Sequence, residues 1–235
     1  MIPKFSWNLV SREYVTYLAH YDKNIPNSNS PTPLIGVTTI IGNYQYFLPV
    51  SSVKEKYFKM TERPDFIRLT DNGILLSAIN LNNMFPVSNE LIIPFKYDEV
   101  NNYFHFSNTG NMIALFKKEL SIINKKRDEI VERANILYET KFDIPHSKVS
   151  ERCCNFDMLE EKCIEYQRVN HILSECRFIG TKSNLYHIYD NLSNQDDFEK
   201  VVALLDTPVR SNMIKQLSSE ELDDVVSRSI EQTKE

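Results

Sequence analysis

The stretch LIGVTTIIGNYQYFLPVSS, Leu34–Ser52, decides the fold of this chain. Two segments rich in β-branched and aromatic residues, Leu34–Ile41 and Tyr44–Val50, flank the dipeptide Gly42-Asn43. Such segments favour strands, and a Gly-Asn pair between them is typical of a tight turn that needs positive φ. The sequence therefore predicts an antiparallel hairpin at this place.

Shorter patterns on both sides of this hairpin predict further strands and helices. Helical spacing of apolar residues from Asn111 to Glu139 predicts one long amphipathic helix. Further helices are expected over residues 12–22, with Ser11 as the cap, and from Asn155 onward. Further strands are expected over residues 3–10, 65–69, 74–81, 91–95 and 103–106.

Many short strands with helices between and after them indicate an α+β fold. A highly twisted antiparallel sheet that forms a partial barrel, surrounded by helices, would bury these strands and limit free edges. After residue 182, a linker and one or two acidic helices broken at Pro208 are expected to form a C-terminal helical extension.

Composition and charge narrow the class of protein. The 235 residues are 42% hydrophobic, which is enough for a packed core, and the net charge is −5. Residues 1–150 hold 17 Lys and Arg against 15 Asp and Glu, and residues 151–235 hold 10 against 17, so the acidity lies in the last third. The first two thirds are therefore free to present a basic surface.

The sequence carries no sign of a membrane segment, a leader peptide or a disulfide framework. No run approaches the ~20 apolar residues of a membrane helix. The four cysteines are clustered without zinc-site spacing, which indicates reduced thiols in a cytoplasmic protein.

The segment SSVKEKYFK, Ser51–Lys59, raises the main functional question. Ser52-Val53-Lys54-Glu55 fits a capping box, in which Ser52 would cap a helix. A helix start also offers free N–H groups to an anion, and Lys54, Lys56 and Lys59 add positive charge. Both interpretations, a structural cap and a phosphate site, remain open on the sequence alone.

Aromatic residues around this segment admit two interpretations as well. Tyr46, Phe47, Tyr57 and Phe58 could stack on nucleic-acid bases, although strand aromatics usually lie in the core. Nucleophile elbows, HExxH motifs, Walker loops and dinucleotide fingerprints are absent, and none of the five histidines falls in the segment. We therefore expect no metal and no cofactor, and any catalysis would be metal-independent.

Four blocks of the sequence, in the same order, resemble the ToxN/AbiQ family of endoribonuclease toxins from type III toxin–antitoxin systems. The resemblance covers about residues 1–166. The blocks are EYVTYLAHYDKNIPN (Glu13–Asn27), LIGVTTIIGNYQYFLPVSSVKEK (Leu34–Lys56), INLNNMFPV (Ile79–Val87) and CNFDMLEEKCIEY (Cys154–Tyr166).

This resemblance implies a fold, an activity and a set of partners. It implies metal-independent cleavage of cellular and phage mRNA that leaves a 2′,3′-cyclic phosphate and stops the growth of phage-infected cells. It also implies inhibition by a small, repeated, pseudoknotted RNA antitoxin that the enzyme processes and then binds in a protein–RNA hetero-oligomer. The domain expected from it spans residues 1–166, and the acidic extension spans residues 167–235.

The family's essential serine matches Ser52, the hydroxyl residue before it matches Ser51, and its lysine matches Lys54. A further active-site lysine of the family falls on Thr32, so either Lys23 or Lys56 replaces it or that contact is absent from this chain. The remaining RNA contacts are expected from Lys56, Lys59, Tyr57 and Thr32.

The chemistry of these groups suggests their roles. A free lysine, with a pKa near ~10.4, is a poor base at neutral pH, so Lys54 is expected to act as an electrostatic clamp on the phosphate. Ser52 is expected to hydrogen-bond the reacting phosphate or the 2′-oxygen, with Ser51 in support. The alternative is a non-catalytic RNA- or protein-binding module on the same sheet.

Overall fold

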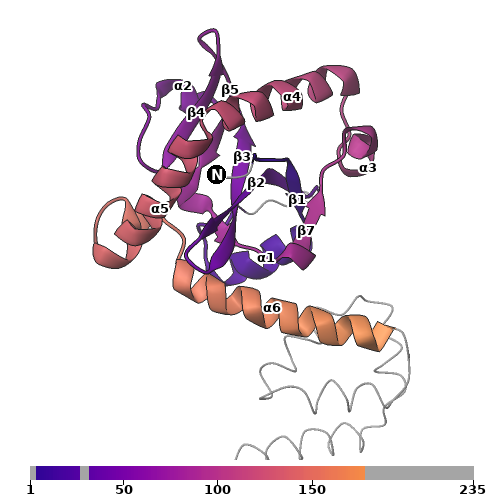
Figure 1. Ribbon diagram of the computed structural model, residues 1–235, viewed down its shortest axis with the longest axis vertical. Coiled ribbons are helices and arrows are strands. Elements are labelled where there is room, and N and C mark those ends of the chain that lie inside the picture. The colour runs from indigo at the N-terminus through magenta and orange to yellow at the C-terminus, as the bar shows by residue number, and fades with distance from the viewer. Residues whose placement is uncertain (1–3, 27–31, 178–235) are drawn as a thin grey trace, which may run out of the picture. The chain divides into compact units, whose positions relative to one another are not determined.

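The computed structural model describes residues 4–26 and 32–177, and a seven-stranded antiparallel sheet forms its centre (Figure 1). The strands follow the order β4-β5-β3-β2-β1-β7, and β6 pairs with β3 beside this path, so the sheet does not close. With helices around it, this sheet confirms the predicted α+β class. The strands are β1 (Asn8–Val10), β2 (Leu34–Ile41), β3 (Tyr44–Ser52), β4 (Phe66–Asp71), β5 (Ile74–Asn80), β6 (Phe85–Pro86) and β7 (Ile92–Pro94).

The predicted hairpin is confirmed, and the strands predicted at residues 65–69 and 74–81 form a second hairpin. Strands β2 and β3 pair up to Ile41 and Tyr44, and Gly42 in the turn has φ +57°. Strands β4 and β5 are joined by Asn72 and Gly73, whose φ values are +46° and +81°. Positive φ favours glycine and asparagine, so the turn residues account for these hairpins.

Six helices in the described residues cover parts of the sheet (Figure 1). Helix α4 packs on β4 and β5, and α5 packs on β2. No helix of the described residues has the length and apolar character needed to cross a membrane. The helices are α1 (Arg12–Tyr21), α2 (Glu55–Lys59), α3 (Val100–Tyr103), α4 (Thr109–Lys125), α5 (Arg127–Asp143) and α6 (Phe156–Arg177), with 3₁₀ turns at Leu81–Asn83, Asn89–Leu91, Tyr97–Glu99 and Ser150–Arg152.

Two predicted elements are wrong. The single long helix is divided into α4 and α5 at Lys126, whose φ of −94° and ψ of 11° leave the helical region. Residues 103–106 form no strand, because Tyr103 ends α3 and the rings of Phe104 and Phe106 pack against Phe116 instead.

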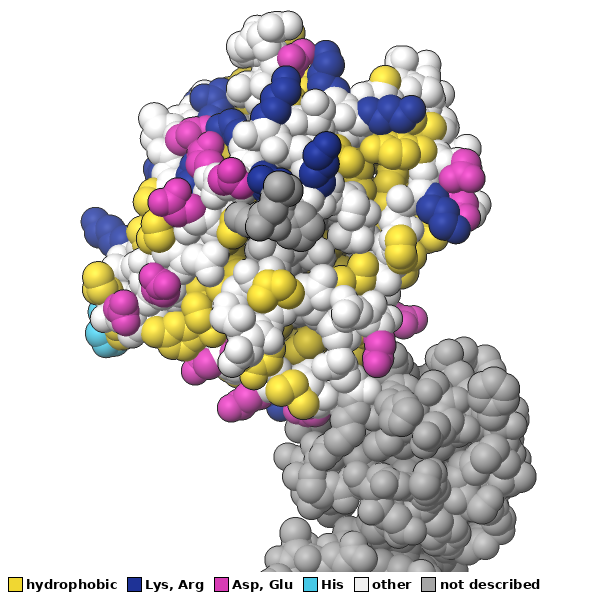
Figure 2. All heavy atoms as spheres, viewed as in Figure 1, with side chains coloured by type: hydrophobic (Ala, Val, Ile, Leu, Met, Phe, Trp, Pro, Cys, Tyr) yellow, Lys and Arg dark blue, Asp and Glu magenta, His cyan; other side chains and the backbone are white. Residues whose placement is uncertain are grey.

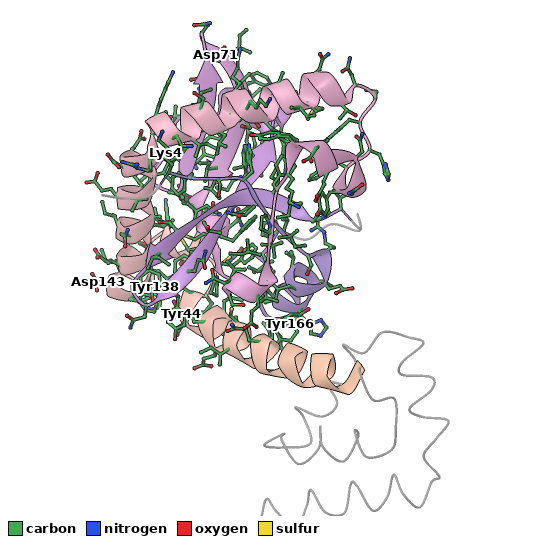
Figure 3. All side chains as sticks on the ribbon, turned by 45° about the vertical axis from the view of Figure 1, so that its right-hand side comes forward. Lys4, Tyr44, Asp71, Tyr138, Asp143 and Tyr166 are labelled. Atoms are coloured by element: carbon green, nitrogen blue, oxygen red, sulfur yellow. The ribbon has the colours of Figure 1, made fainter. Side chains whose placement is uncertain are left out.

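Helix α6 is joined to the sheet by a buried carboxyl group. Oε1 of Glu160 accepts hydrogen bonds from the hydroxyls of Tyr46 on β3, at 2.5 Å, and Tyr138 on α5, at 3.0 Å. Burial, together with Glu160, raises the pKa of Tyr138 to about 12. The side chain of Tyr138 lies at the lower part of α5 in Figure 3. This link fixes α5 and the start of α6 against β3.

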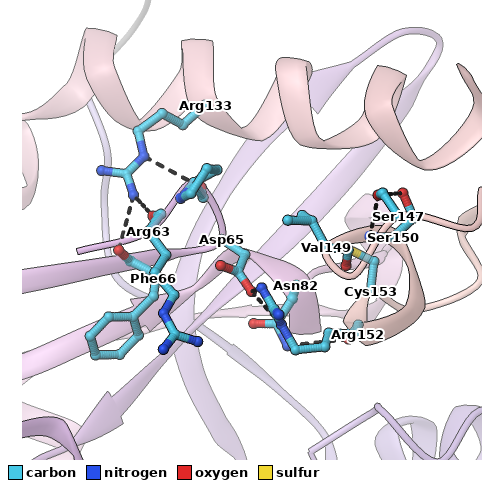
Figure 4. A network of polar contacts seen from close by, with 11 residues as sticks. Arg63, Asp65, Phe66, Asn82, Arg133, Ser147, Val149, Ser150, Arg152 and Cys153 are labelled. Atoms are coloured by element: carbon cyan, nitrogen blue, oxygen red, sulfur yellow. Dashed lines mark hydrogen bonds and ion pairs between the residues drawn. The ribbon is translucent and has the colours of Figure 1, made fainter. Parts of the chain in front are cut away.

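Two arginines hold the loop that precedes β4 (Figure 4). Arg133 on α5 donates to the backbone oxygens of Arg63 and Phe66. Arg152 donates to Oδ2 of the buried Asp65 from Nε at 3.1 Å and from Nη2 at 2.9 Å. These contacts fix the connection between α2 and β4, and thus the surroundings of the segment that follows β3.

The chain divides into two compact units, Met1–Ile164 and Glu165–Glu235. The predicted linker and acidic helices after residue 182 lie outside the described residues. Within the first unit Cys153, Cys154 and Cys163 are buried free thiols.

Candidate active site

The end of β3 projects beyond β2. Gly36 of β2 is paired with Pro49 of β3, but the residues before Gly36 pair with β1 instead. The last three residues of β3, Val50–Ser52, pair with Ile79, Ala78 and Ser77 of β5 on the other side. In the described sheet, Ser51 and Ser52 therefore have a neighbouring strand on one side only.

Gly36 allows β2 to pass close to β3 where the two strands separate. A Cβ atom at Gly36 would lie 2.3 Å from the backbone oxygen of Leu48 and 2.7 Å from Cζ of Phe47. Contacts this short require the backbone to shift, so only glycine fits here. The close crossing fixes the point at which the end of β3 becomes uncovered.

Ser52 and Lys54 lie on the surface at this uncovered end. Ser52 is the last residue of β3, and Lys54 is the residue before α2. Both side chains are exposed, and within the described residues neither one forms a hydrogen bond or an ion pair. Two polar groups suited to a phosphate are thus open to a ligand.

The predicted capping box is wrong. Helix α2 begins at Glu55, its N-cap position is Lys54, and no side chain caps it. Ser52 lies too early because β5 extends the pairing of β3 through this residue. The Ser52 hydroxyl is therefore not used to stabilise the helix.

Ser51 differs from Ser52 because its oxygen is held by Asn80. Nδ2 of Asn80 donates to Oγ of Ser51 at 3.1 Å and to the hydroxyl oxygen of Tyr57 at 3.2 Å. Since the Ser51 oxygen accepts this bond, its own hydrogen is free to point to another acceptor. Asn80 was not identified from the sequence, because only the pairing of β3 with β5 brings it beside Ser51.

Arg68 on β4 shares a face of the sheet with Ser51. Arg68 and Ser51 both pair with Ala78 of β5, and directly opposed residues project to the same face. Nε of Arg68 is buried and has no hydrogen-bond partner. This strand register adds a cation that sequence reasoning missed.

Behind Ser52 lies a buried carboxyl group. Ser52 is paired with Ser77, and the carboxyl group of Glu119 on α4, which is 4% exposed, lies near the Ser77 hydroxyl. Burial raises the pKa of Glu119 to about 7, and the Ser77 hydroxyl opposes that rise. A carboxyl group that titrates near neutral pH thus supports the strand that carries Ser52.

The other predicted RNA contacts on α2 differ in exposure: the two lysines are exposed and the tyrosine is buried. Lys56 and Lys59 are exposed on α2, and Phe58 between them is 62% exposed. Tyr57 is 2% exposed and packs on Phe66, so the prediction that its ring contacts RNA needs correction. The ring is buried because α2 uses it to cover the sheet. The rings of Tyr46 and Phe47, which are fully buried, are core residues as well.

Thr32 lies beside a cation other than the expected lysine. Nε of Arg12 donates to the backbone oxygen of Thr32 at 3.1 Å, and Nη1 of Arg12 donates to the backbone oxygen of Pro26 at 3.4 Å. Lys23 instead borders a hollow of about 750 Å³ that is lined by parts of α1, α5 and α6 and by none of the Ser51–Lys59 residues. Arg12 is thus a cation held at the Thr32 position. In the described part of the chain, no cluster of His, Cys, Asp and Glu could hold a metal ion.

The INLNNMFPV block connects the other three blocks. Asn80 bonds Ser51 of the second block, and Asn83 donates to the backbone oxygen of Asn24 in the first. The backbone oxygen of Asn82 accepts from the N–H of Cys154, in the fourth block, at 2.9 Å. The four blocks therefore form one connected structure around the end of β3.

Comparison with known proteins agrees with this arrangement. The chain is 29% identical over 182 residues to the endoribonuclease ToxN of Bacillus thuringiensis subsp. kurstaki, covering 70% of this chain and 84% of the relative. It is 27% identical over 164 residues to the endoribonuclease ToxN of Pectobacterium atrosepticum, covering 65% and 88%.

Solved structures share the fold. The lactococcal anti-phage endoribonuclease AbiQ superposes with a TM-score of 0.60 at 19% identity, over 70% of this chain and 99% of that one. A type III toxin described as inhibited by a non-coding RNA pseudoknot superposes with a TM-score of 0.57 at 23% identity, over 70% and 99%. The family model of toxin ToxN from type III toxin–antitoxin systems matches residues 6–164, and the chain belongs to this family.

Proposed function

We propose that this chain is a metal-independent endoribonuclease toxin that cuts RNA by attack of the RNA's own 2′-hydroxyl. The observation that carries the proposal is the exposure of Ser52 and Lys54, whose polar groups have no partner in the described residues, at the uncovered end of β3 in a ToxN-family chain. Relatives named endoribonucleases support the same reaction class.

The reaction needs alignment and charge stabilisation more than a protein nucleophile. The 2′-oxygen must lie in line with the leaving 5′-oxygen, and negative charge grows on the oxygens around phosphorus. The Lys54 ammonium group neutralises this charge, and the Ser52 hydroxyl hydrogen-bonds a phosphate oxygen or the 2′-oxygen. Products then carry a 2′,3′-cyclic phosphate and a 5′-hydroxyl.

Ser51 takes part as a fixed hydrogen-bond donor. Because its oxygen accepts from Asn80, its O–H is directed away from the amide and toward the ligand. Arg68, on the same face, adds positive charge beneath it. Asn80 acts through Ser51 and is a positioning residue.

The partners follow from family membership. A related toxin is described as inhibited by an RNA pseudoknot, and another structural relative as regulated by a processed non-coding RNA. A small pseudoknotted RNA antitoxin is the inhibitor of this chain in a protein–RNA assembly, and cytoplasmic mRNA is its substrate. The nuclease domain spans residues 1–166, and residues 167–235 form a separate acidic extension.

The ends of the RNA products test this function. Purified protein is incubated with mRNA in EDTA, and the new 3′ ends are identified by mass spectrometry. The proposal predicts cleavage with 2′,3′-cyclic phosphate ends. Loss of cleavage in EDTA, or 3′-hydroxyl ends, would contradict it, and RNA binding without cleavage would indicate the non-catalytic binding module instead.

A further inference from the structure

A basic hollow lies on the outer face of α4, apart from the Ser51–Lys59 segment. This α4 hollow measures about 440 Å³, and no acidic side chain of the described residues lines it. Its charged groups are the ammonium groups of three exposed lysines, Lys4, Lys117 and Lys125. Such a hollow suits an anionic ligand.

The α4 hollow is built by defined contacts. Asn124 of α4 accepts from the N–H of Phe5 at 2.8 Å and donates to its backbone oxygen at 3.1 Å. This pair of hydrogen bonds holds Lys4 beside the end of α4. Figure 3 shows Lys4 near the junction of α4 and α5. Lys117 and Lys125 lie on one face of α4, two helical turns apart.

Among the described residues, no acidic side chain forms an ion pair with the lysines of the α4 hollow. Neighbouring lysines of the same helix region are paired, Lys118 with Asp71 at 2.8 Å and Lys126 with Glu129 at 3.5 Å. Lys117 instead lies 5.3 Å from the centre of the Tyr97 ring. Lys and Arg side chains gather over α4 in Figure 2. A concentrated positive field thus remains on this face.

A surface of mixed polar and apolar side chains adjoins the α4 hollow. A second hollow of about 370 Å³ shares Lys4 and is lined by the polar side chains of Ser6, Thr38, Thr39 and Gln45 and by the apolar side chains of Phe5, Ile40 and Val131. The two hollows that share Lys4 thus offer ammonium groups on one side and hydroxyl, amide and apolar groups on the other. This arrangement suits a polymer with repeated charges and sugar hydroxyls better than a single phosphate ion.

We propose that the α4 hollow binds the phosphate backbone of structured RNA, at a place separate from the cleavage site. The inference rests on the proposed function, which makes RNA the partner. Lys4, Lys117 and Lys125 replace counterions along one stretch of the backbone, and the adjoining hollow lies along its sugars. Long structured RNA thereby gains affinity that a short single strand, which occupies only the cleavage site, does not.

The test compares charge reversal inside and outside the α4 hollow. Lys117→Glu and Lys125→Glu are matched with Lys148→Glu, an exposed lysine beyond the far end of the 17-residue α5, about 25 Å away by helix rise. Binding is measured by fluorescence anisotropy with a 2′-O-methyl stem–loop RNA, which has no 2′-hydroxyl to attack. Cleavage is measured with a short single-stranded RNA.

We expect each hollow variant to bind the stem–loop about three- to tenfold more weakly than Lys148→Glu, with a salt slope smaller by about 0.7–0.9. All three variants should cut the short RNA at the wild-type rate. Equal stem–loop affinity in the hollow variants and the Lys148→Glu control would overturn the inference. That result is the one expected if the surface binds a protein partner instead of RNA. Failure of the wild-type protein to cut RNA would refute the proposed function while leaving the binding comparison intact.

Discussion

Ser51 and Ser52 are neighbours in sequence but are held in different ways. Successive side chains of a strand project to opposite faces, so Ser52 is exposed and without a partner in the described residues, whereas Ser51 is half-buried and bonded to Asn80. The sequence showed the hydroxyl pair. It could not show Asn80 or Arg68, because the register that aligns them with Ser51 depends on pairings between distant segments.

The effect of Asn80 on catalysis, through its hydrogen bond to Ser51, can be separated from its effect on stability. In Asn80→Asp the carboxylate cannot donate to Ser51, so we expect kcat to fall by about 10- to 100-fold while KM changes much less. Tyr57→Phe removes the other partner of the same amide and should keep kcat near the wild-type value. Steady-state cleavage kinetics measure both. Equal losses of kcat in the two variants would contradict the positioning role.

Glu119 makes the stability of the fold depend on pH. Its folded-state pKa of about 7 lies above the ordinary value of 4.5, so the folded state binds more protons between these pH values. The free energy of unfolding therefore falls as pH rises from about 4.5 through 7, by on the order of 3 kcal/mol, and levels off about one pH unit above 7.

Glu119→Gln should remove this fall and stabilise the protein at pH 8. Urea unfolding at pH 5 and pH 8 measures how far the free energy of unfolding changes between the two pH values. Glu132→Gln, at an exposed position on α5, is the matched control. The same pH dependence in Glu119→Gln and wild type would show that Glu119 is not the group responsible.

At the level of elements, the separation of β2 from β3 creates the site. Gly36→Ala would force a Cβ against the Leu48 backbone, so we expect a loss of about 1–3 kcal/mol in the free energy of unfolding and weaker RNA cleavage. Gly110→Ala is the control, because its Cβ would meet only Oδ1 of Asn108 at 3.6 Å. Denaturant unfolding should find this control unchanged or up to ~1 kcal/mol more stable. Equal stability of Gly36→Ala and wild type would contradict the close crossing.

Local sequence signals predicted some elements and not others. The hairpin Leu34–Val50 was predictable because its turn residues and β-branched strands act within a few residues. The capping box failed because a distant strand, β5, pairs with Ser52. The division at Lys126 also escaped prediction, since the amphipathic pattern continues across it without proline or glycine, while α4 and α5 pack on different strands.

At the level of the whole molecule, the family model ends at residue 164 and the first compact unit at Ile164. A chain of residues 1–177, which keeps α6 to its last residue, Arg177, should unfold in one cooperative transition and cut RNA at the full-length rate. The removed part carries 11 acidic and 6 basic residues, so RNA affinity should not fall. Calorimetry and cleavage assays measure these outcomes. Loss of cleavage by a folded 1–177 chain would show that the extension contributes to the active domain.

The most direct measurement of the central claim is the cleavage rate of Ser52→Ala and Lys54→Ala beside Ser107→Ala, an exposed serine outside the site. We expect the first two variants to lose about 100-fold or more in rate while their melting temperatures match that of Ser107→Ala, because neither side chain has a structural partner in the described residues. Wild-type cleavage by folded Ser52→Ala protein would contradict the assignment of this surface as the site of RNA cleavage.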